Sequence, residues 1–360
     1  MLPILDRYII RKFLGTFFFT ISLLLLISVV FDIAEKIDDF LENQAPIDEI
    51  IFDYYINFVV YFGNLFSSLI TFIAVIIFTS KMASNTEIIA ILNSGVSFKR
   101  MMRPYLIAAT LIASINFAFS NWIIPITNQS RLDFTYKYLK NPPSTRYKNL
   151  HRQVKPGVYL YFETFNSARN IGYQFNMETF NDNQLVTKFQ ADYLRWDDNK
   201  SMWRAENYVH REILPDNSER LSYGAGLDTS LIFDPAGLVN QGMLIETMNY
   251  SDLNEFIAME KARGAENVHF YEVEKHQRMS YPFSTFILTF IAACIATRKK
   301  RGGMGVHLAF GLALSVIYIL FMKVSTTFAT NGNLSPMLAV WIPNIVFTAL
   351  SFVLYRKVQK

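Results

Sequence analysis

The stretch "FLGTFFFTISLLLLISVVF", residues 13–31, decides what class of protein this chain forms. It contains no Asp, Glu, Lys or Arg. Because a helix rises about 1.5 Å per residue, roughly 20 such residues cross the hydrocarbon core of a bilayer. The stretch leads into "FDIAEKIDDF" and not into a small-residue cleavage site. We therefore interpret it as a retained membrane span and not as a signal peptide.

Further runs of the same kind follow along the chain. Of the 360 residues, 51% are hydrophobic, and they are gathered into blocks. The later charge-free runs are 54–80, 104–130, 279–297, 302–322 and 324–355. The last run is too long for one span, but "TNGNLSP" interrupts it, so we expect the final helix to start near Pro336. The sequence therefore predicts an α-helical membrane protein with six transmembrane helices.

The charges between the spans predict the orientation of the protein in the membrane. Short loops on the cytoplasmic side carry an excess of Lys and Arg. Here the positive residues lie at both termini, in the loop between spans 2 and 3, and in the loop between spans 4 and 5. They are Arg7, Arg11, Lys12, Lys81, Lys99, Arg100, Arg103, Arg298, Lys299, Lys300, Arg301, Arg356, Lys357 and Lys360. We therefore expect both termini in the cytoplasm. The net charge of +4 gives no indication of a nucleic-acid partner, and we expect none.

A segment of different composition separates the first three spans from the last three. We assign residues 1–125 to spans 1–3, residues 126–278 to an extracytoplasmic domain, and residues 279–360 to spans 4–6. In this domain, runs rich in aromatic and β-branched residues alternate with turn formers, as is typical of strands. The runs are "GVYLYFETF", "GYQFNMETF", "QLVTKFQADYLRW", "SMWRAENYVHREIL" and "LDTSLIF". Their spacing predicts an all-β, jelly-roll-like domain.

A helical connector is expected where this domain ends, at about 251–278. Ser251 is expected to cap a first helix and Gly264 to end it. A second helix then leads the chain into the fourth span.

The loop between the second and third spans contains a short amphipathic helix, predicted at about 84–95. Ser84 and Glu87 have the spacing of a capping box, in which each side chain satisfies an amide at the helix start. Gly95 is expected just past the helix end. The apolar residues expected on one face are Ile88, Ile89, Ile91 and Leu92. The helix is either a surface helix capped by Glu87 beside lipid-binding arginines, or a docking element for a soluble protein.

With its spans and inserted domain, the chain resembles the lipopolysaccharide export permease family (LptF/LptG). The resemblance covers nearly the whole chain. It is carried, in order, by "LDRYIIRKFLGTF", "ASNTEIIAILNSGVSFKRMMRP", "NWIIPITNQ", "YEVEKHQRMSYPFSTFILTFIA", "RGGMGVHLAFGLALSVIYIL" and "NLSPMLAVWIPNIVF". The segment "LDRYI" is slightly more similar to LptG than to LptF.

The resemblance implies a permease subunit of an ABC transporter in a bacterial inner membrane, with the β domain in the periplasm. In this family two permeases pair, and two copies of a cytoplasmic P-loop ATPase dock on the loops between spans 2 and 3. Lipopolysaccharide leaves the membrane through a cavity between the permeases and passes along jelly-roll domains to a periplasmic bridge protein. The family's coupling-helix glutamate corresponds to Glu87. ATPase coupling is therefore expected of Glu87, Ile88, Ile91 and Gly95.

The sequence lacks the motifs of several enzyme classes. It has no G-x-x-x-x-G-K-[ST], HExxH or GxSxG, and "RGGMGV" has no Lys-Ser/Thr pair to hold a phosphate. We expect a transporter subunit with no catalytic residue, metal or cofactor of its own, and ATP with Mg²⁺ on a separate chain. The single cysteine, Cys294, excludes an intramolecular disulfide. The alternatives are another ABC permease, such as a lipoprotein releaser, a membrane-anchored β adaptor, and an intramembrane enzyme.

Cations beside the spans are the candidate contacts for an anionic lipid. Lys36 follows the first span, with Asp32 and Glu35 on nearly the same helical face, and Lys323 lies in the fifth span, about 24 Å of helical rise from His307. We predict that Asp32, Glu35, Lys36 and Lys323 bind substrate. The alternatives are an i,i+4 pair between Lys36 and Asp32, and snorkelling of Lys323. Family members carry several basic residues where this chain is acidic, so a partner or divalent ions would supply positive charge there.

Overall fold

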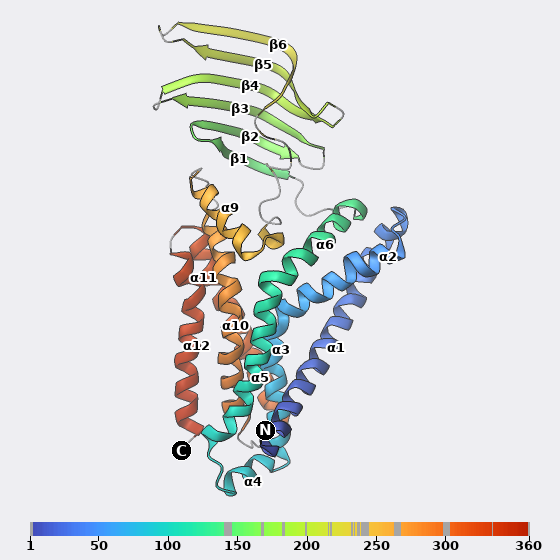
Figure 1. Ribbon diagram of the computed structural model, residues 1–360, viewed down its shortest axis with the longest axis vertical. Helices are drawn as coiled ribbons and strands as arrows, with labels where there is room; N and C mark the ends of the chain where they lie inside the picture. The colour runs from blue at the N-terminus through green and yellow to red at the C-terminus, as the bar shows by residue number, and fades with distance from the viewer. Residues whose placement is uncertain are drawn as a thin grey trace. The chain divides into compact units, whose positions relative to one another are not determined.

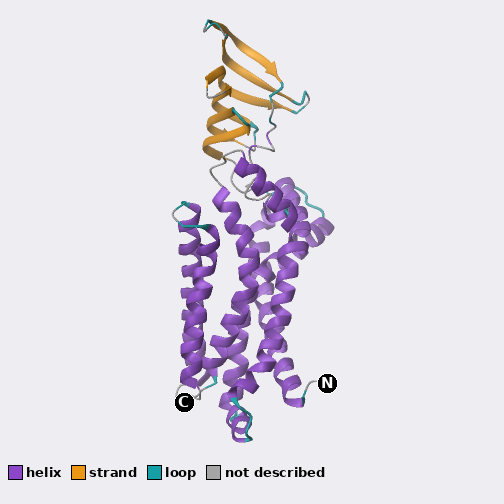
Figure 2. Ribbon diagram, turned by 60° about the vertical axis from the view of Figure 1, so that its left-hand side comes forward, coloured by secondary structure: helices purple, strands orange, loops and turns teal. Residues whose placement is uncertain are grey.

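The chain forms two compact units. One comprises residues 1–138, 246–253 and 269–360, and the other residues 139–245 and 254–268. The computed structural model describes the chain except for residues 1–2, 140–145, 167–168, 182–183, 199, 215, 217, 232, 234, 236–237, 239–244, 263–267, 298–302, 333 and 359–360. Figure 2 shows that the first unit is built of helices and that the strands are confined to the second. The predicted insertion of a β domain between two groups of helices is confirmed.

The helical unit contains the six long apolar helices that the sequence predicts. They are α1 (Ile4–Glu42), α2–η1–α3 (Ile47–Glu49, Ile50–Tyr55, Ile56–Ser84), α5–η2–α6 (Phe98–Ala118, Phe119–Ile123, Ile124–Tyr138), α10 (Val268–Ala296), α11 (Gly303–Thr330) and α12 (Pro336–Val358). The sixth span begins at Pro336, as expected. The third continues to Tyr138, so the helical unit reaches beyond residue 125.

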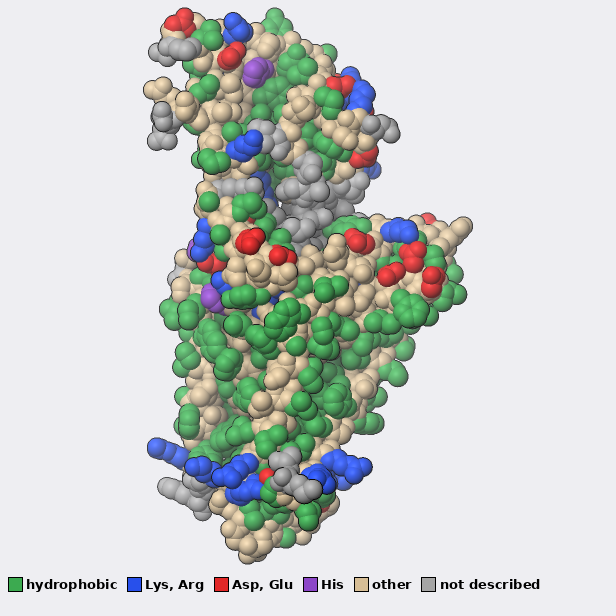
Figure 3. Space-filling model, in the orientation of Figure 1, with side chains coloured by type: hydrophobic (Ala, Val, Ile, Leu, Met, Phe, Trp, Pro, Cys, Tyr) green, Lys and Arg blue, Asp and Glu red, His purple; other side chains and the backbone are tan. Residues whose placement is uncertain are grey.

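Positive charge gathers at one end of the helical unit. The start of α1, the end of α12 and the short helix α4 (Glu87–Asn93) lie at this end (Figure 1). Lys and Arg side chains form a band there, whereas Asp and Glu side chains gather around α2 (Figure 3). The predicted loop cations Arg298, Lys299, Lys300 and Arg301, with Lys360, lie outside the described residues.

Buried apolar side chains join the base of α1 to α3 and α5. The Phe13 ring stacks on Phe78 with centroids 5.4 Å apart and lies 6.3 Å from Tyr105. Gly311 of α11 lies against Ile76 of α3, since a Cβ atom at Gly311 would stand 2.1 Å from the Ile76 side chain. The glycine therefore lets α11 approach α3 closely.

Two of the spans contain a π turn, which inside an α-helix often marks a functional position. An asparagine accompanies each turn. The Asn57 amide donates to the Asp53 carbonyl at 2.7 Å, and the Asn121 amide donates to the Phe117 carbonyl at 2.9 Å. The second turn, η2, contributes Ser120 to a cavity described below.

The β unit is one six-stranded antiparallel sheet in the order β1-β2-β3-β4-β5-β6. The strands are β1 (Arg146–Lys155), β2 (Val158–Asn166), β3 (Ile171–Asn181), β4 (Gln184–Asp197), β5 (Met202–Ile213) and β6 (Glu219–Thr229). Every described strand pairs with its neighbour in sequence, so these strands form a meander, without the crossing connections of a jelly roll.

One face of the sheet carries the core of the β unit. Phe162, Phe165 and Trp203 are each 0% exposed. Phe233, which follows β6, packs its ring against Trp203 at 5.3 Å, and the Trp203 indole donates to the Phe233 carbonyl at 2.8 Å. Phe233 therefore covers part of the apolar face.

Several local predictions in this region were wrong. The run "LDTSLIF" was expected as a separate strand, but its first residues, Leu227 to Thr229, end β6. Helix α9 (Tyr250–Ala262) is not capped by Ser251. The Asn249 Oδ1 atom accepts instead from the Ser251 amide at 2.9 Å, since the cap and the helix start lie two residues earlier than expected. Gly264 lies outside the described residues.

Candidate functional site

Helix α4 follows α3 after a sharp turn. Thr86 adopts left-handed backbone angles, with φ of 59°, and caps α4 with no side-chain hydrogen bond. The predicted capping box is wrong because Ser84 still belongs to α3 and its hydroxyl donates to the Lys81 carbonyl at 2.9 Å. The predicted position of Gly95 just past the helix end is confirmed: it has φ of +86°, and its amide donates to the Leu92 carbonyl at 3.1 Å. The helix is thus shorter than the predicted 84–95.

The Glu87 carboxylate joins α4 to α1. It accepts hydrogen bonds from the Tyr8 hydroxyl at 2.7 Å, from Lys12 Nζ at 3.1 Å, and from the Asn85 amide at 3.3 Å. We refer to Tyr8, Lys12, Asn85 and Glu87 as the Glu87 cluster. Partial burial opposes ionisation of Glu87, but the hydrogen bonds from Tyr8, Lys12 and Asn85 outweigh it and lower the pKa of its carboxyl. Glu87 is therefore ionised at neutral pH.

A second ion pair joins α1 to α5, on the other side of the loop. Arg100 donates from both terminal nitrogens to the two oxygens of Asp6, at 2.7 and 2.9 Å. Asp6 is buried although it is charged, so the bidentate pairing satisfies a group that would be costly to bury alone. The first turns of α1 thus hold the α4 loop at both of its ends.

The apolar residues of α4 do not share one face, contrary to prediction. Ile88 is 1% exposed and Ile91 packs against the helical core. Ile89 is 47% exposed and Leu92 36% exposed. Residues three apart on a helix are neighbours, so the four residues form one inward and one outward pair. The outward pair, Ile89 and Leu92, is an apolar surface at the positively charged end of the bundle.

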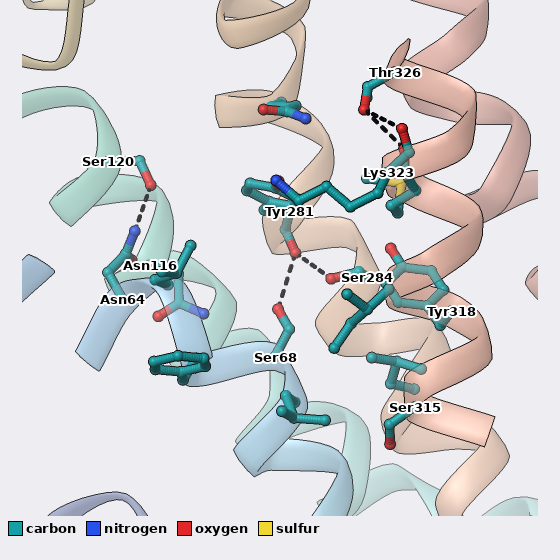
Figure 4. Close-up of a pocket in the computed structure, with 17 residues that line it drawn as sticks. Asn64, Ser68, Asn116, Ser120, Tyr281, Ser284, Ser315, Tyr318, Lys323 and Thr326 are labelled. Atoms are coloured by element: carbon teal, nitrogen blue, oxygen red, sulfur yellow. Dashed lines mark hydrogen bonds between the residues drawn. The ribbon is translucent and has the colours of Figure 1, made fainter. Parts of the chain in front are cut away.

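Two neighbouring cavities lie among α3, α5, η2, α10 and α11. The first has a volume of about 260 Å³ and is lined by side chains such as Ser68, Tyr318 and Met322. The second has a volume of about 400 Å³ and is more polar. Both are lined by Lys323 and Tyr281. Figure 4 shows Lys323 extending from α11 toward α10 alongside Tyr281.

Charged side chains surround the second cavity. Glu246 accepts from the Asn128 amide at 2.9 Å and lies 4.0 Å from the guanidinium of Arg131. Arg278 donates to Glu274 at 3.4 Å and to a backbone carbonyl, that of Met248, at 2.7 Å. These contacts fix residues 246–248, which precede α9, against the bundle.

Lys323 differs from the arginines of this region. Its ammonium makes no hydrogen bond or ion pair with the described residues, although Glu274 lies within electrostatic reach. A cation without a direct partner in a partly apolar cavity is suited to an anionic ligand, because it needs no rearrangement to bind one.

At the end of the first span the structure contains the i,i+4 pair between Lys36 and Asp32 that was the alternative to substrate binding. Lys36 is bonded to Asp32 and to the hydroxyl of Tyr54, and the Tyr55 hydroxyl donates to Asp32 at 3.2 Å. Glu35 is exposed. Asp32, Glu35 and Lys36 line neither cavity, so the structure does not bring them together with Lys323.

The sequence reasoning missed several residues of these sites. Glu274 and Arg278 carry an i,i+4 ion-pair spacing next to an apolar run, a signal that could have identified them. Asp6 and Arg100 are too far apart in sequence for any local signal. In the described part of the chain, no cluster of three or more His, Cys, Asp or Glu side chains is placed to hold a metal ion.

Comparison with known proteins gives one family. The family described as "Lipopolysaccharide export system permease LptF/LptG" matches residues 7–357, nearly the whole chain. No curated protein matches the sequence.

Proposed function

The chain belongs to the lipopolysaccharide export permease family LptF/LptG, and from this premise we propose that a separate ATPase drives it by docking on α4. As a member of this family it is a permease subunit of lipopolysaccharide export and a multi-pass protein of the inner membrane. The family match along residues 7–357 carries the assignment, and it does not favour a lipoprotein releaser or a β adaptor.

The docking surface in this proposal is the outward face of α4. Ile89 and Leu92 offer apolar area that a soluble partner can cover, and Gly95 ends the helix abruptly. Ile88 and Ile91 anchor the inner face, while Glu87 fixes the helix to α1. A displacement of the outward face by the partner is therefore transmitted to α1 through the contacts of Glu87. ATP and Mg²⁺ belong to the ATPase, which acts as a dimer on two permeases.

A cytoplasmic position for α4 and both termini agrees with the band of Lys and Arg at that end of the bundle (Figure 3). The β unit then lies in the periplasm. The second permease is proposed to cover α1 and α11. The spans of α1 and α11 are the least buried of the six within this chain, at 17% and 28%, whereas that of α10 is 61% buried. The apolar surfaces of α1 and α11 are therefore available to a partner.

Lys323 is the proposed contact for an anionic phosphate of the lipid. It extends into a cavity that also has apolar walls, as an amphipathic ligand requires. Asp32, Glu35 and Lys36 would act at the other proposed position only with a partner's cations or a divalent ion, because Lys36 is already bonded to Asp32.

The β6 edge is the proposed contact for the periplasmic bridge protein. β6 is the last strand of the sheet and pairs on one side only among the described strands. Leu221 and Tyr223 on this strand are 58% and 79% exposed. An unpaired edge with exposed apolar side chains is suited to the addition of a strand from another β domain.

Co-purification tests the proposal. The tagged chain, isolated from its own membranes, is expected to bring down a P-loop ATPase and a related six-span permease. The Ile89→Asp variant should lose the ATPase and keep the permease. Recovery of the chain with neither partner would overturn the proposal and favour an adaptor.

A further inference from the structure

A pocket of about 340 Å³ lies on the sheet of the β unit. Its lining residues are His151, Tyr159, Leu160, Tyr161, Asn176 and Glu178. They come from β1, β2 and β3, and the register places His151 opposite Tyr161 and Tyr161 opposite Asn176. The side chains of His151, Tyr161 and Asn176 therefore form a continuous row across three strands.

The aromatic rings of this pocket are held in place. The Tyr161 ring lies 4.5 Å from the His151 ring, and its hydroxyl donates to Asn149 Oδ1 at 3.1 Å. Tyr159 accepts from the Gln153 amide at 3.2 Å and is nevertheless 46% exposed. Fixed, partly exposed tyrosine rings bind flat apolar surfaces with little loss of conformational entropy.

The pocket also offers a hydrogen-bond acceptor. The Asn176 amide nitrogen donates to Glu178 at 3.2 Å, but its Oδ1 atom is enclosed and has no donor among the described residues. That atom is too enclosed to meet a ligand, so the acceptor that the pocket presents is the Glu178 carboxylate, whose side chain is 29% exposed. The hydrogen bond and ion pair from Lys188, 2.9 Å away, keep the pKa of Glu178 below its usual range, so its carboxylate accepts but does not donate.

These features select the class of ligand. None of the six lining residues is Lys or Arg, and the nearby Lys188 ammonium is already paired with Glu178, so phosphate is a poor ligand. A hydrocarbon chain would cover the Glu178 carboxylate without offering it a hydrogen bond. A sugar ring presents C–H groups on its faces and hydroxyl donors at its rim, and both match.

We propose that this pocket binds a neutral saccharide, the sugar portion of the transported glycolipid. The identity of the saccharide rests on the proposed function, whereas the preference for hydroxyl donors on a tyrosine surface rests on the pocket alone. The site would hold the head of the molecule on the polar face of the sheet, opposite the apolar core face.

Saturation-transfer NMR on the full chain in glycolipid-free nanodiscs tests this inference. The probe is the oligosaccharide released from lipopolysaccharide by mild acid and then dephosphorylated. We expect transfer to sugar protons that does not change with salt, because no charge pair is involved. Tyr161→Ala should weaken binding about tenfold, and Tyr161→Phe should retain it because the ring remains.

Tyr173→Ala is the matched control, since Tyr173 on β3 is 44% exposed and lies outside the pocket. Equal thermal unfolding of all variants would show that the sheet is intact. Absence of transfer in the unmodified chain, or equal transfer in Tyr161→Ala, would overturn the inference. The co-purification experiment tests the proposed function independently, because recruitment of partners through α4 does not involve this pocket.

Discussion

The Glu87→Gln substitution tests whether the Glu87 cluster fixes α4 to α1. Glutamine keeps an oxygen that can accept from Tyr8 but loses the charge that pairs with Lys12, 3.1 Å away. Hydrogen bonds to charged groups contribute about 1.5–3 kcal/mol and exposed ion pairs about 0.2–1 kcal/mol. The side chains of Lys12 and Glu87 are 32% and 26% exposed, between these cases, so we expect a loss of about 1.5 kcal/mol.

Hydrogen exchange of the α4 amides measures this loss. A change of about 1.4 kcal/mol shifts an opening equilibrium roughly tenfold, so the amides of residues 90–94 should exchange about ten times faster. The ATPase should still co-purify, since its proposed contact is the outward pair of α4, but hydrolysis should drive less export. Glu35→Gln, an exposed carboxylate at the far end of α1, is the control. Unchanged exchange in Glu87→Gln would refute the reasoning, and loss of the ATPase itself would make Glu87 a direct docking residue.

The same cluster has a defined pH dependence. The pKa of Glu87 is lowered from its ordinary value of 4.5, so the folded state favours the charged carboxylate. Its contribution is therefore fully present above pH 4.5 and is lost as the pH falls through the lowered pKa. Protection of α4 against exchange, corrected for intrinsic rates, should be constant from pH 7 to pH 5 and should fall at lower pH. Glu87→Gln should remove this fall in protection at low pH.

Three further sets of substitutions test the remaining contacts. Asp6→Asn should lower the thermal unfolding temperature in detergent, because removing one partner of a buried pair costs about 3 kcal/mol. The double variant Asp6→Asn with Arg100→Gln should recover part of this loss. An unchanged unfolding temperature in Asp6→Asn alone would contradict the role of the pair. Ile89→Asp should abolish ATPase recruitment with no change in unfolding temperature, whereas Ile88→Asp should destabilise the fold, since Ile88 is 1% exposed. Lys323→Glu should reduce photocrosslinking of lipopolysaccharide from probes beside the first cavity several-fold, while Lys323→Arg retains it; equal crosslinking in both would assign Lys323 to snorkelling.

The spans could be predicted from sequence because the bilayer imposes a length and a composition on each of them. Pro336 was correctly expected at the start of the sixth span, since the interrupting "TNGNLSP" segment contains turn formers and ends in a residue favoured in the first helical turn. Gly95 was correct for a similarly local reason, because left-handed backbone angles favour glycine.

The strands at both edges of the sheet were not predicted as such. β1 reads "RYKNLHRQVK", which is largely polar, and β6 reads "ERLSYGAGLDT", which contains two glycines. Neither has the run of aromatic and branched residues that identified the other strands. Their conformation comes from pairing with β2 and β5, which is a tertiary effect.

The candidate site was only partly visible in the sequence, because its contacts join distant segments. Glu87 was identified by its helix, but Tyr8 and Lys12 lie 79 and 75 residues away from it. The prediction that Ile89 shares a face with Ile88 was wrong because the sequence of a short apolar helix does not reveal which of its faces packs against the bundle. The unpaired state of Lys323 depends on the packing of α10 and α11 and has no local signal.

The attachments of α1 determine how a movement of α4 would spread. At one end, α1 is bonded to α4 through Glu87 and to α5 through Asp6. Near the other end it is bonded to η1, since Lys36 contacts Tyr54 and Asp32 accepts from Tyr55. Between these ends only 17% of its span is buried within the chain, and its contacts are with α3 and α5, where Phe13 and Phe17 lie in the helical core. A helix of 39 residues with an intact hydrogen-bond ladder moves more easily as a rod than it bends. A displacement of α4 would therefore be transmitted along α1 to η1, about 36 Å away for the roughly 24 residues between the two sets of contacts, and would change the surface that α1 exposes.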